Sequence, residues 1–391
     1  MSDAEIQALL DSVSREFDAA VVLEDVHFRL VARAGQDGTA DGVDAASVVG
    51  QRASAEVVAW REQFGIRDAS EPVRIPARPQ NDMRARWSVP VRFRGVHLGY
   101  LWIPDADRIE VDGLRHAVEA AEQTGAILYR RSLAAQADTG LLRLLLTPDP
   151  QHGGVAPDLL ALRSHPRGTP VAAVVARFGN VDTPGPAALS DLDTAVRRAA
   201  DEASYDSTLA GVILGAGVLV TTVRSKDDLG VAMELAADVH RLASELSRGE
   251  ECLVTVGGAK ELEHVDQSWL EARRALRIVR AVPDLGPVAC WNDLGIFRAF
   301  AALPPQAIEE DVIDKRVRRL LADEVLASTA ETFLDLVGNV QDVAARLFLH
   351  RATVYQRLDR IAALCDLDLR HSGDDRLLVH LGLKLSRLTR A

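Results

Sequence analysis

The sequence predicts a multidomain α+β protein whose C-terminal part is helical. Its 391 residues suffice for two to three domains at roughly 100–200 residues each. Up to about residue 302, segments with the alternating apolar pattern of strands are interspersed with segments of helical periodicity. After Leu303-Pro304-Pro305 the periodicity is helical to Ala391. The chain therefore divides near residue 303 into a mixed α/β part and an all-helical part.

The composition is that of a soluble globular protein. Hydrophobic residues make up 48% and charged residues 26% of the chain, which excludes wholesale disorder. The net charge of -12 argues against indiscriminate coating of nucleic acid or membrane, although it leaves room for one basic face. No apolar run approaches the ~20 residues of a membrane span, and the acidic N-terminus is not a secretory signal. We therefore expect a cytoplasmic protein without a membrane partner.

The three cysteines indicate free thiols. Cys252, Cys290 and Cys365 lie far apart and form no CxxC pair. A disulfide framework or a zinc site is therefore not expected, and reduced thiols fit a cytosolic compartment. The sequence suggests neither a metal nor a cofactor.

Residues 1–132 are predicted to form a first domain, a small antiparallel sheet bracketed by helices. The turn between its two longest strands is expected at Arg94-Gly95. This order of elements is similar to that of the GAF/PAS class of sensor domains, which implies that the domain could bind a small-molecule effector. The expected elements are a helix at 6–17, strands at 19–25 and 28–35, two strands within 86–104, and a helix from 112 to about 133.

The last of these helices carries an apolar stripe at heptad-like spacing, formed by Leu114, Val118, Ala121, Gly125 and Leu128. Two interpretations remain open. The stripe could form a parallel dimer helix, or it could pack on the sheet of its own domain. A helical linker is expected to follow at 133–168.

The middle segment, 169–302, is predicted to form a second α+β domain. Its elements follow the order βαββαβ, which suggests a ferredoxin-like sandwich. The Gly215-Ala216-Gly217 triplet lies at the tip of the central hairpin and is expected to form a plain turn. A helical linker, 303–327, separates this domain from the C-terminal residues 328–391.

The stretch NVQDVAARLFLHRATVYQRLDRI, residues 339–361, predicts a helix-turn-helix. Asn339 is suited to cap a first helix from Val340 to about Leu347. After a brief turn, a second helix is expected from Arg351 to about Leu364, with Val354, Leu358 and Ile361 on its inward face. The small residues Ala344 and Ala345 are expected where the two helices cross.

The remaining side chains of the second helix suit contact with DNA in the major groove. Arginine can chelate guanine, glutamine can pair with adenine, and threonine can contact phosphate or a thymine methyl group. The alternative is that the arginines only solvate an amphipathic helix, paired with Asp359 or Asp342. The predicted DNA-binding residues, expected on one exposed face, are Arg351, Thr353, Gln356, Arg357 and Arg360.

The same segment carries a longer pattern, at Asn339, Ala344, Leu347, His350, Arg351, Thr353, Val354, Arg357, Leu358, Asp375, Arg376, Leu377, Leu381 and Leu383. In this pattern it resembles the C-terminal helix-turn-helix domain of the PucR/CdaR family of bacterial transcriptional regulators. Ala352 stands where that family usually has asparagine, and Gln356 where it has tyrosine. Either departure could alter base preference.

In that family a degenerate GGDEF-like domain precedes the helix-turn-helix, with a stretch resembling S-x-x-E-A-x-x-A-L. Ser268, Glu271, Ala272, Ala275 and Leu276 supply it here. An active cyclase of that fold would need carboxylates to hold Mg²⁺. The hairpin tip has none, so the resemblance implies a domain without enzymatic activity.

These observations predict a cytoplasmic, DNA-binding transcription regulator that acts as a homodimer or higher homo-oligomer. Its partner would be double-stranded DNA, and a small-molecule effector could control it through the N-terminal domain and the geometry of the dimer. Two alternatives remain open. The chain could be an enzyme related to nucleotide cyclases, or a protein-interaction module that uses its terminal helices.

Overall fold

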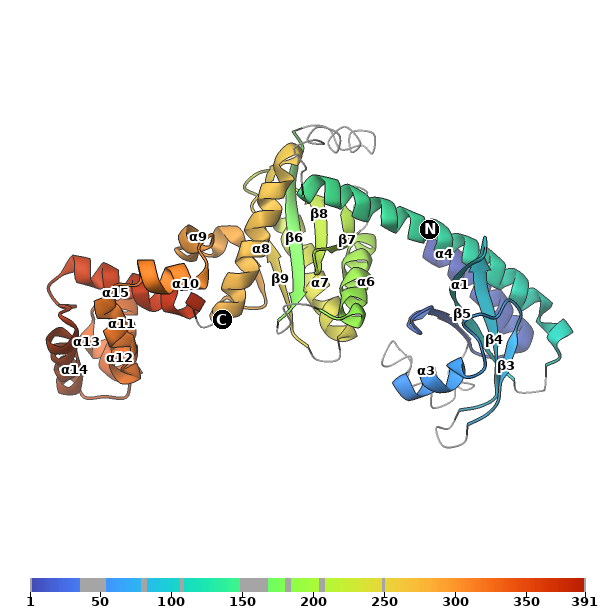
Figure 1. Ribbon diagram of the computed structural model, residues 1–391, viewed down its shortest axis with the longest axis horizontal. Coiled ribbons are helices and arrows are strands. Elements are labelled where there is room, and N and C mark those ends of the chain that lie inside the picture. Colours follow the sequence, from blue (N-terminus) through green and yellow to red (C-terminus); the bar gives the residue numbers. More distant parts are fainter. Residues whose placement is uncertain are drawn as a thin grey trace. The chain divides into compact units, whose positions relative to one another are not determined.

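The computed structural model describes residues 2–35, 54–78, 83–105, 109–147, 168–179, 184–203, 208–247 and 250–389. The chain divides into two compact units, Met1–Gly140 and Leu141–Ala391 (Figure 1). Both units contain strands and helices, and the described residues from 291 to 389 contain helices but no strand, as expected. The finer five-part division stays a prediction, and residues 148–167 of its first linker lie outside the described residues.

A five-stranded antiparallel sheet of order β2-β1-β5-β4-β3 forms the centre of the first unit. The N-terminal helix, the first hairpin and the two long alternating strands are confirmed. The helix expected to end near residue 133 continues to Leu146. Its last apolar residues pack on the sheet of the second unit and belong to that unit's core. The elements are α1 (Ser2–Phe17), β1 (Val21–Asp25), β2 (Leu30–Ala34), α3 (Ala55–Glu62), β3 (Val73–Ile75), β4 (Arg86–Phe93), β5 (Val96–Pro104), the 3-10 helix η3 (Val111–Leu114) and α4 (Arg115–Leu146).

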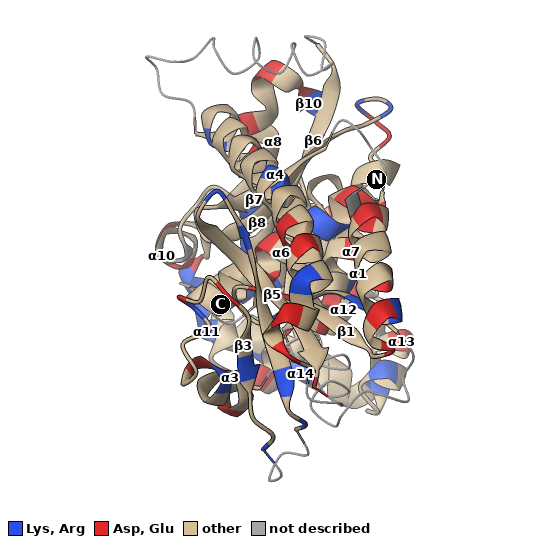
Figure 2. Cartoon of the chain, turned by 90° about the vertical axis from the view of Figure 1, so that its right-hand side faces the viewer, with Lys and Arg blue, Asp and Glu red and all other residues tan. Residues whose placement is uncertain are grey.

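The two faces of this sheet bury separate cores. Strand residues such as Val89 and Leu101 pack against Ile6 of α1 and Leu114 before α4, as the alternation of side chains along strands requires. Acidic and basic residues intermix on the outer side of α4 (Figure 2). The opposite face of the sheet packs against the α3 region through Val22, Phe28, Val57, Ile66, Ile75, Met83, Tyr100 and Trp102.

Two local features of the first unit follow from glycine. Arg94 and Gly95 form the β4–β5 turn with φ of 50° and 81°, the positive values of a two-residue hairpin loop. Gly125 of α4 lies against β4, where an added Cβ would meet the Arg92 carbonyl oxygen at 2.6 Å. The apolar stripe of α4 therefore packs on the sheet of its own unit, as one of the two interpretations expected.

The second unit contains the predicted βαββαβ order, in β6-α6-β7-β8-α7-β9. Its sheet has the order β11-β9-β6-β8-β7, with β10 paired to β6. The four strands β9-β6-β8-β7 are antiparallel neighbours, the pattern of a ferredoxin-like sandwich. The elements are β6 (Pro170–Phe178), α6 (Pro186–Glu202), β7 (Leu209–Ile213), β8 (Ala216–Thr222), α7 (Gly230–Leu246), β9 (Cys252–Val256), β10 (Lys260–Glu261), η4 (Leu262–His264), α8 (Val265–Ala281), η5 (Pro283–Leu285), β11 (Val288–Cys290) and η6 (Trp291–Asp293).

Helices cover both faces of this sheet (Figure 1). α6 and α7 pack on the face that carries Val174 of β6. α8 and the end of α4 pack on the face that carries Val175. Because β6 is buried on both faces, its sequence PVAAVVARF is continuously apolar over most of its length.

The S-x-x-E-A pattern of α8 has a structural explanation. The Ser268 hydroxyl accepts a hydrogen bond from the Ala173 N–H of β6 at 3.0 Å. Glu271 accepts one from the Gly258 N–H at 2.9 Å. Gly257 lies so close to α8 that an added Cβ would be 2.0 Å from the Ser268 carbonyl oxygen. These contacts fix the position of α8 on the sheet.

The tip of the central hairpin differs slightly from the expectation. The turn is formed by Leu214 and Gly215, with φ of 48° and 77°, and Ala216 and Gly217 already belong to β8. Gly217 is needed against α6, where an added Cβ would meet Val196 Cγ1 at 2.9 Å. The turn itself contains no acidic residue.

The C-terminal helices share one hydrophobic core, which includes Ile278 and Val279 of α8 and Val317, Phe333 and Leu358 further on. The predicted helical character of this region is confirmed. The helices are α9 (Phe297–Phe300), α10 (Pro305–Ala307), the π-helical η7 (Ile308–Val312), α11 (Lys315–Leu321), α12 (Glu324–Asp335), α13 (Val340–Arg346), α14 (Arg351–Cys365), α15 (Gly373–Ser386) and η8 (Arg387–Thr389).

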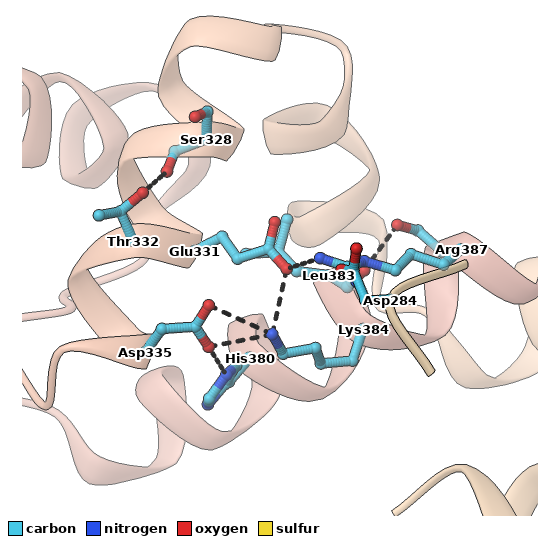
Figure 3. A network of polar contacts seen from close by, with 10 residues as sticks. Asp284, Ser328, Glu331, Thr332, Asp335, His380, Leu383, Lys384 and Arg387 are labelled. Carbon is cyan, nitrogen blue, oxygen red and sulfur yellow. Dashed lines mark hydrogen bonds and ion pairs between the residues drawn. The ribbon is translucent and has the colours of Figure 1, made fainter. Parts of the chain in front are cut away.

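A polar network joins α12 to α15 and η8 (Figure 3). Glu331 accepts hydrogen bonds from Arg387 at 2.8 Å and from Lys384 at 3.2 Å. Asp335 contacts His380 at 2.9 Å and Lys384 at 3.0 Å. Partial burial of Asp335 opposes ionisation, but hydrogen bonds and charges from Lys384 and His380 outweigh it and hold the pKa of the carboxyl below its usual value. The network aligns the two helices that flank α13 and α14.

The three cysteines are free and buried. Burial raises the pKa of Cys252 to about 12, so the thiol stays protonated at neutral pH. Within the described ranges, no helix has the length and apolar character needed to cross a membrane. The same parts of the chain contain no group of three or more potential metal ligands from His, Cys, Asp and Glu.

Candidate nucleic-acid interface

Side-chain caps start both helices of the predicted pair. The side-chain carbonyl oxygen of Asn339 accepts hydrogen bonds from the N–H groups of Gln341 at 3.0 Å and Asp342 at 3.4 Å. The His350 ring accepts from the Ala352 N–H at 3.4 Å. Each cap satisfies N–H groups that have no partner inside the helix. The helices therefore begin at the positions that the sequence predicts.

A three-residue turn, Leu347 to Leu349, connects α13 to α14. Phe348 has a φ of 54°, a conformation that is unfavourable for a residue with a Cβ, and its side chain is 95% exposed. The Leu349 N–H closes the turn on the Ala344 carbonyl at 2.8 Å. α13, the turn and α14 together form a helix-turn-helix.

The inward face of α14 is the predicted one. Val354, Leu358 and Ile361 are buried in the C-terminal core. Of the two alanines expected at the crossing, Ala344 is buried in this core but Ala345 is exposed. The crossing therefore needs a small residue at the first of these positions only.

Three of the five predicted DNA-binding side chains are exposed, as expected. Arg351 and Gln356 are exposed on α14, and Arg360 is 69% exposed. Thr353 is half-buried. In the described part of the chain, the Arg351 side chain has no hydrogen-bond or ion-pair partner. The N-terminal half of α14 thus presents a guanidinium group and a carboxamide to solvent.

The expectation that Arg357 shares this exposed face is wrong. Arg357 is half-buried, and its guanidinium donates to the Thr329 hydroxyl of α12 at 3.0 Å. Thr329 is fully buried and in turn donates to the Val325 carbonyl at 2.7 Å. Arg357 lies three residues after Val354 and four before Ile361, which places it beside the buried stripe of the helix. Its contact holds α14 at a fixed position against α12.

We expect Thr329→Val and Arg357→Ala each to destabilise the C-terminal helices by about 1.5–3 kcal/mol, because each leaves a polar group in the interface without its partner. The double variant should be less destabilised than the sum of the two, which a double-mutant cycle of urea unfolding measures. Arg346→Ala, a change at an exposed arginine of α13, is the control and should shift stability by less than about 0.5 kcal/mol. Additive effects would show that the two side chains do not act together.

Arg360 forms a weak ion pair within the domain. Its guanidinium lies 3.7 Å from the carboxylate of Asp323, which caps α12. An exposed pair of this kind contributes about 0–1 kcal/mol. Asp359 on the same helix is bonded to Arg370. Arg360 can therefore exchange Asp323 for a phosphate at little cost.

Two further exposed residues were not predicted. Arg346 ends α13, and within the described residues its side chain has no hydrogen-bond or ion-pair partner. Tyr355 is exposed on α14 next to Gln356. Arg346 follows the buried Val343 by three residues, in the last turn of a short helix, so helical periodicity alone did not indicate its exposure. Together with Arg351 they extend the basic and hydrogen-bonding surface of the helix-turn-helix.

Comparison with known proteins identifies the type of the C-terminal helix-turn-helix domain. Residues 326–385 match the model of the PucR C-terminal helix-turn-helix domain. The chain thus carries a PucR-type helix-turn-helix domain, as the resemblance of its sequence implied. No curated protein matches the chain. Among solved structures, the regulator of polyketide synthase expression from Bifidobacterium adolescentis is 14% identical, covering 63% of this chain and 91% of that one, with a TM-score of 0.25.

Proposed function

We propose that this protein is a sequence-specific DNA-binding regulator of transcription that inserts the N-terminal half of α14 into the major groove. The observation that carries the proposal is the exposed Arg351, which has no partner among the described residues, at the start of a capped helix in a PucR-type helix-turn-helix. An arginine there can bind guanine O6 and N7, and Gln356, five residues later on the same helix, can bind adenine N6 and N7.

The other predicted residues take different parts in this proposal. Thr353 contacts a phosphate or a thymine methyl group beside Arg351. Arg360, together with Arg346, contacts phosphates, which position the protein without reading sequence. Arg357 orients α14 through Thr329 instead of touching a base. Ala352 offers only a methyl group where the family usually has asparagine, so base selection would depend on Arg351 and Gln356.

We further propose that the N-terminal unit is a GAF/PAS-like sensor domain and that the middle part is a GGDEF-like domain without catalysis. The small antiparallel sheet between helices supports the first assignment. The ferredoxin-like strand order and a hairpin turn without an acid support the second. In a homodimer or higher oligomer, an effector would change DNA affinity only as far as it binds one dimer geometry better than another. Two reading helices would then meet half-sites about 34–36 Å apart or a multiple of that.

The test is a titration of the full chain with fragments of genomic DNA, first selected by binding and then compared with a scrambled duplex. We expect tighter binding to the selected duplex and an observed affinity that falls with salt, with a log–log slope of about −0.9 for each phosphate contacted. A protein without preference between the two duplexes, or without salt dependence, would not be the regulator proposed.

A further inference from the structure

A cavity of about 260 Å³ lies in the second unit, between α8 and the sheet. It opens where β6 ends, beside the turn of the β7–β8 hairpin. Its walls come from β6, the β7–β8 turn, β9 and α8, which the ferredoxin-like topology brings together. The lining residues are Val175, Arg177, Phe178, Gly179, Leu214, Ala216, Leu253, Arg273, Leu276, Arg277 and Arg280.

Four of these lining residues are arginines, and none is acidic. Arg273, Arg277 and Arg280 follow one another at spacings of four and three residues on α8, which places them on one face of the helix. Arg177 reaches the same cavity from β6. This is a concave site with several converging positive charges, the general form of a ligand pocket.

Arg273, Arg277 and Arg280 bring three like charges together along α8. Like charges at these spacings repel one another and destabilise a helix. Burial, and then the neighbouring charge of Arg274, lower the pKa of Arg277. The flat guanidinium groups of arginine bind phosphate through paired hydrogen bonds. An anion in the cavity would lie within reach of several guanidinium groups at once.

We propose that this cavity binds a small phosphate-bearing metabolite without a metal ion. The cavity is smaller than the roughly 300–1,000 Å³ of sites for drug-sized ligands, which favours a compact anion over a nucleoside triphosphate. Mg²⁺ bound with a triphosphate needs carboxylate ligands, and the described lining residues supply none. Charge neutralisation therefore comes from the four guanidinium groups.

Occupancy of the cavity bears directly on the C-terminal helices. The Arg277 guanidinium also donates to the Ala301 carbonyl at 2.5 Å, just after α9. The opposite side of α8 contributes Ala275, Ile278 and Val279 to the core that holds α11 to α15. An anion that binds Arg277 therefore contacts α8, the helix that both lines the cavity and packs in the core of the C-terminal helices. Anion binding does not depend on the proposed function, and only its effect on DNA affinity rests on it.

The experiment is isothermal titration calorimetry of the full chain, in buffer with EDTA, using inorganic phosphate, diphosphate and citrate. GTP with Mg²⁺ is added in a separate series without chelator. The test variant is the pair R273Q/R280Q, at two exposed positions whose change should not impair folding. The control is R274Q, which removes a charge from the same helix outside the cavity. Arg177→Gln tests the β6 wall separately.

We expect one saturable site for diphosphate, weakened at least tenfold in R273Q/R280Q and by less than about threefold in R274Q. Diphosphate should bind more tightly than citrate. Tighter binding of citrate would overturn the phosphate assignment, and saturation by GTP with Mg²⁺ alone would overturn the metal-free site. No saturable binding, or equal weakening in test and control variants, would show that the arginines form no site. DNA affinity measured with and without diphosphate then tests the coupling, and loss of DNA binding altogether would not affect the calorimetric result.

Discussion

Gly257→Ala is expected to destabilise the second unit by about 3 kcal/mol or more, a large share of the 5–15 kcal/mol that typically stabilises a folded protein. The new Cβ would lie 2.0 Å from the Ser268 carbonyl oxygen and 2.6 Å from its hydroxyl. The carbonyl belongs to the backbone of α8, so no change of rotamer relieves the clash. α8 would have to move off the sheet and lose the bond from the Ala173 N–H to Ser268.

Urea unfolding followed by circular dichroism measures this change. Gly140→Ala is the matched control, because no atom lies within 4 Å of its new Cβ and alanine is the better helix former by about 1 kcal/mol. The control should unfold at the same or a slightly higher urea concentration. If Gly257→Ala unfolds together with the wild-type chain, α8 does not approach the sheet as closely as described.

Arg351→Ala is expected to weaken binding to the selected DNA by roughly tenfold to a hundredfold, since a bidentate arginine–guanine contact discriminates by about 1–3 kcal/mol. Stability should not change, because Arg351 is exposed and has no partner among the described residues. The loss should be larger for the selected duplex than for a scrambled one. Fluorescence anisotropy with both duplexes measures the two affinities.

Two further variants make this test specific. Arg360→Ala should weaken binding to both duplexes alike and reduce the salt slope by about 1, as expected for a phosphate contact. Arg198→Ala, at an exposed arginine of α6 paired with Glu202, should change neither affinity. If Arg351→Ala binds the selected duplex as the wild type does, α14 does not read bases through its first turn.

Patterns within short segments were sufficient to predict much of the fold. The capping residue Asn339 and the spacing of Val354, Leu358 and Ile361 placed two helices to within about a residue. The Arg94-Gly95 pair marked a hairpin turn. Signals of this kind depend on neighbours three or four residues away at most, so one sequence contains them completely.

Contacts between distant segments were not predictable in the same way. Arg357 bonds to Thr329, 28 residues earlier, and helical periodicity alone does not say which neighbouring helix a flanking arginine meets. The spacing of Arg273, Arg277 and Arg280 is visible in the sequence, but Arg177 joins them only through the order of strands in the folded sheet. The length of α4 was underestimated because its last turns are held by a second core.

The sharing of α8 between two cores determines how this half of the molecule can be dissected. A fragment that begins near residue 303 would leave Phe333 and Val317 without the apolar surface of Ile278 and Val279, with which they share a core. Such a fragment would expose that surface to water and tend to aggregate. A soluble fragment for crystallisation with DNA should therefore begin before Leu142 of α4, whose end packs on the sheet of this unit, and everything from there to the C-terminus should melt in a single transition.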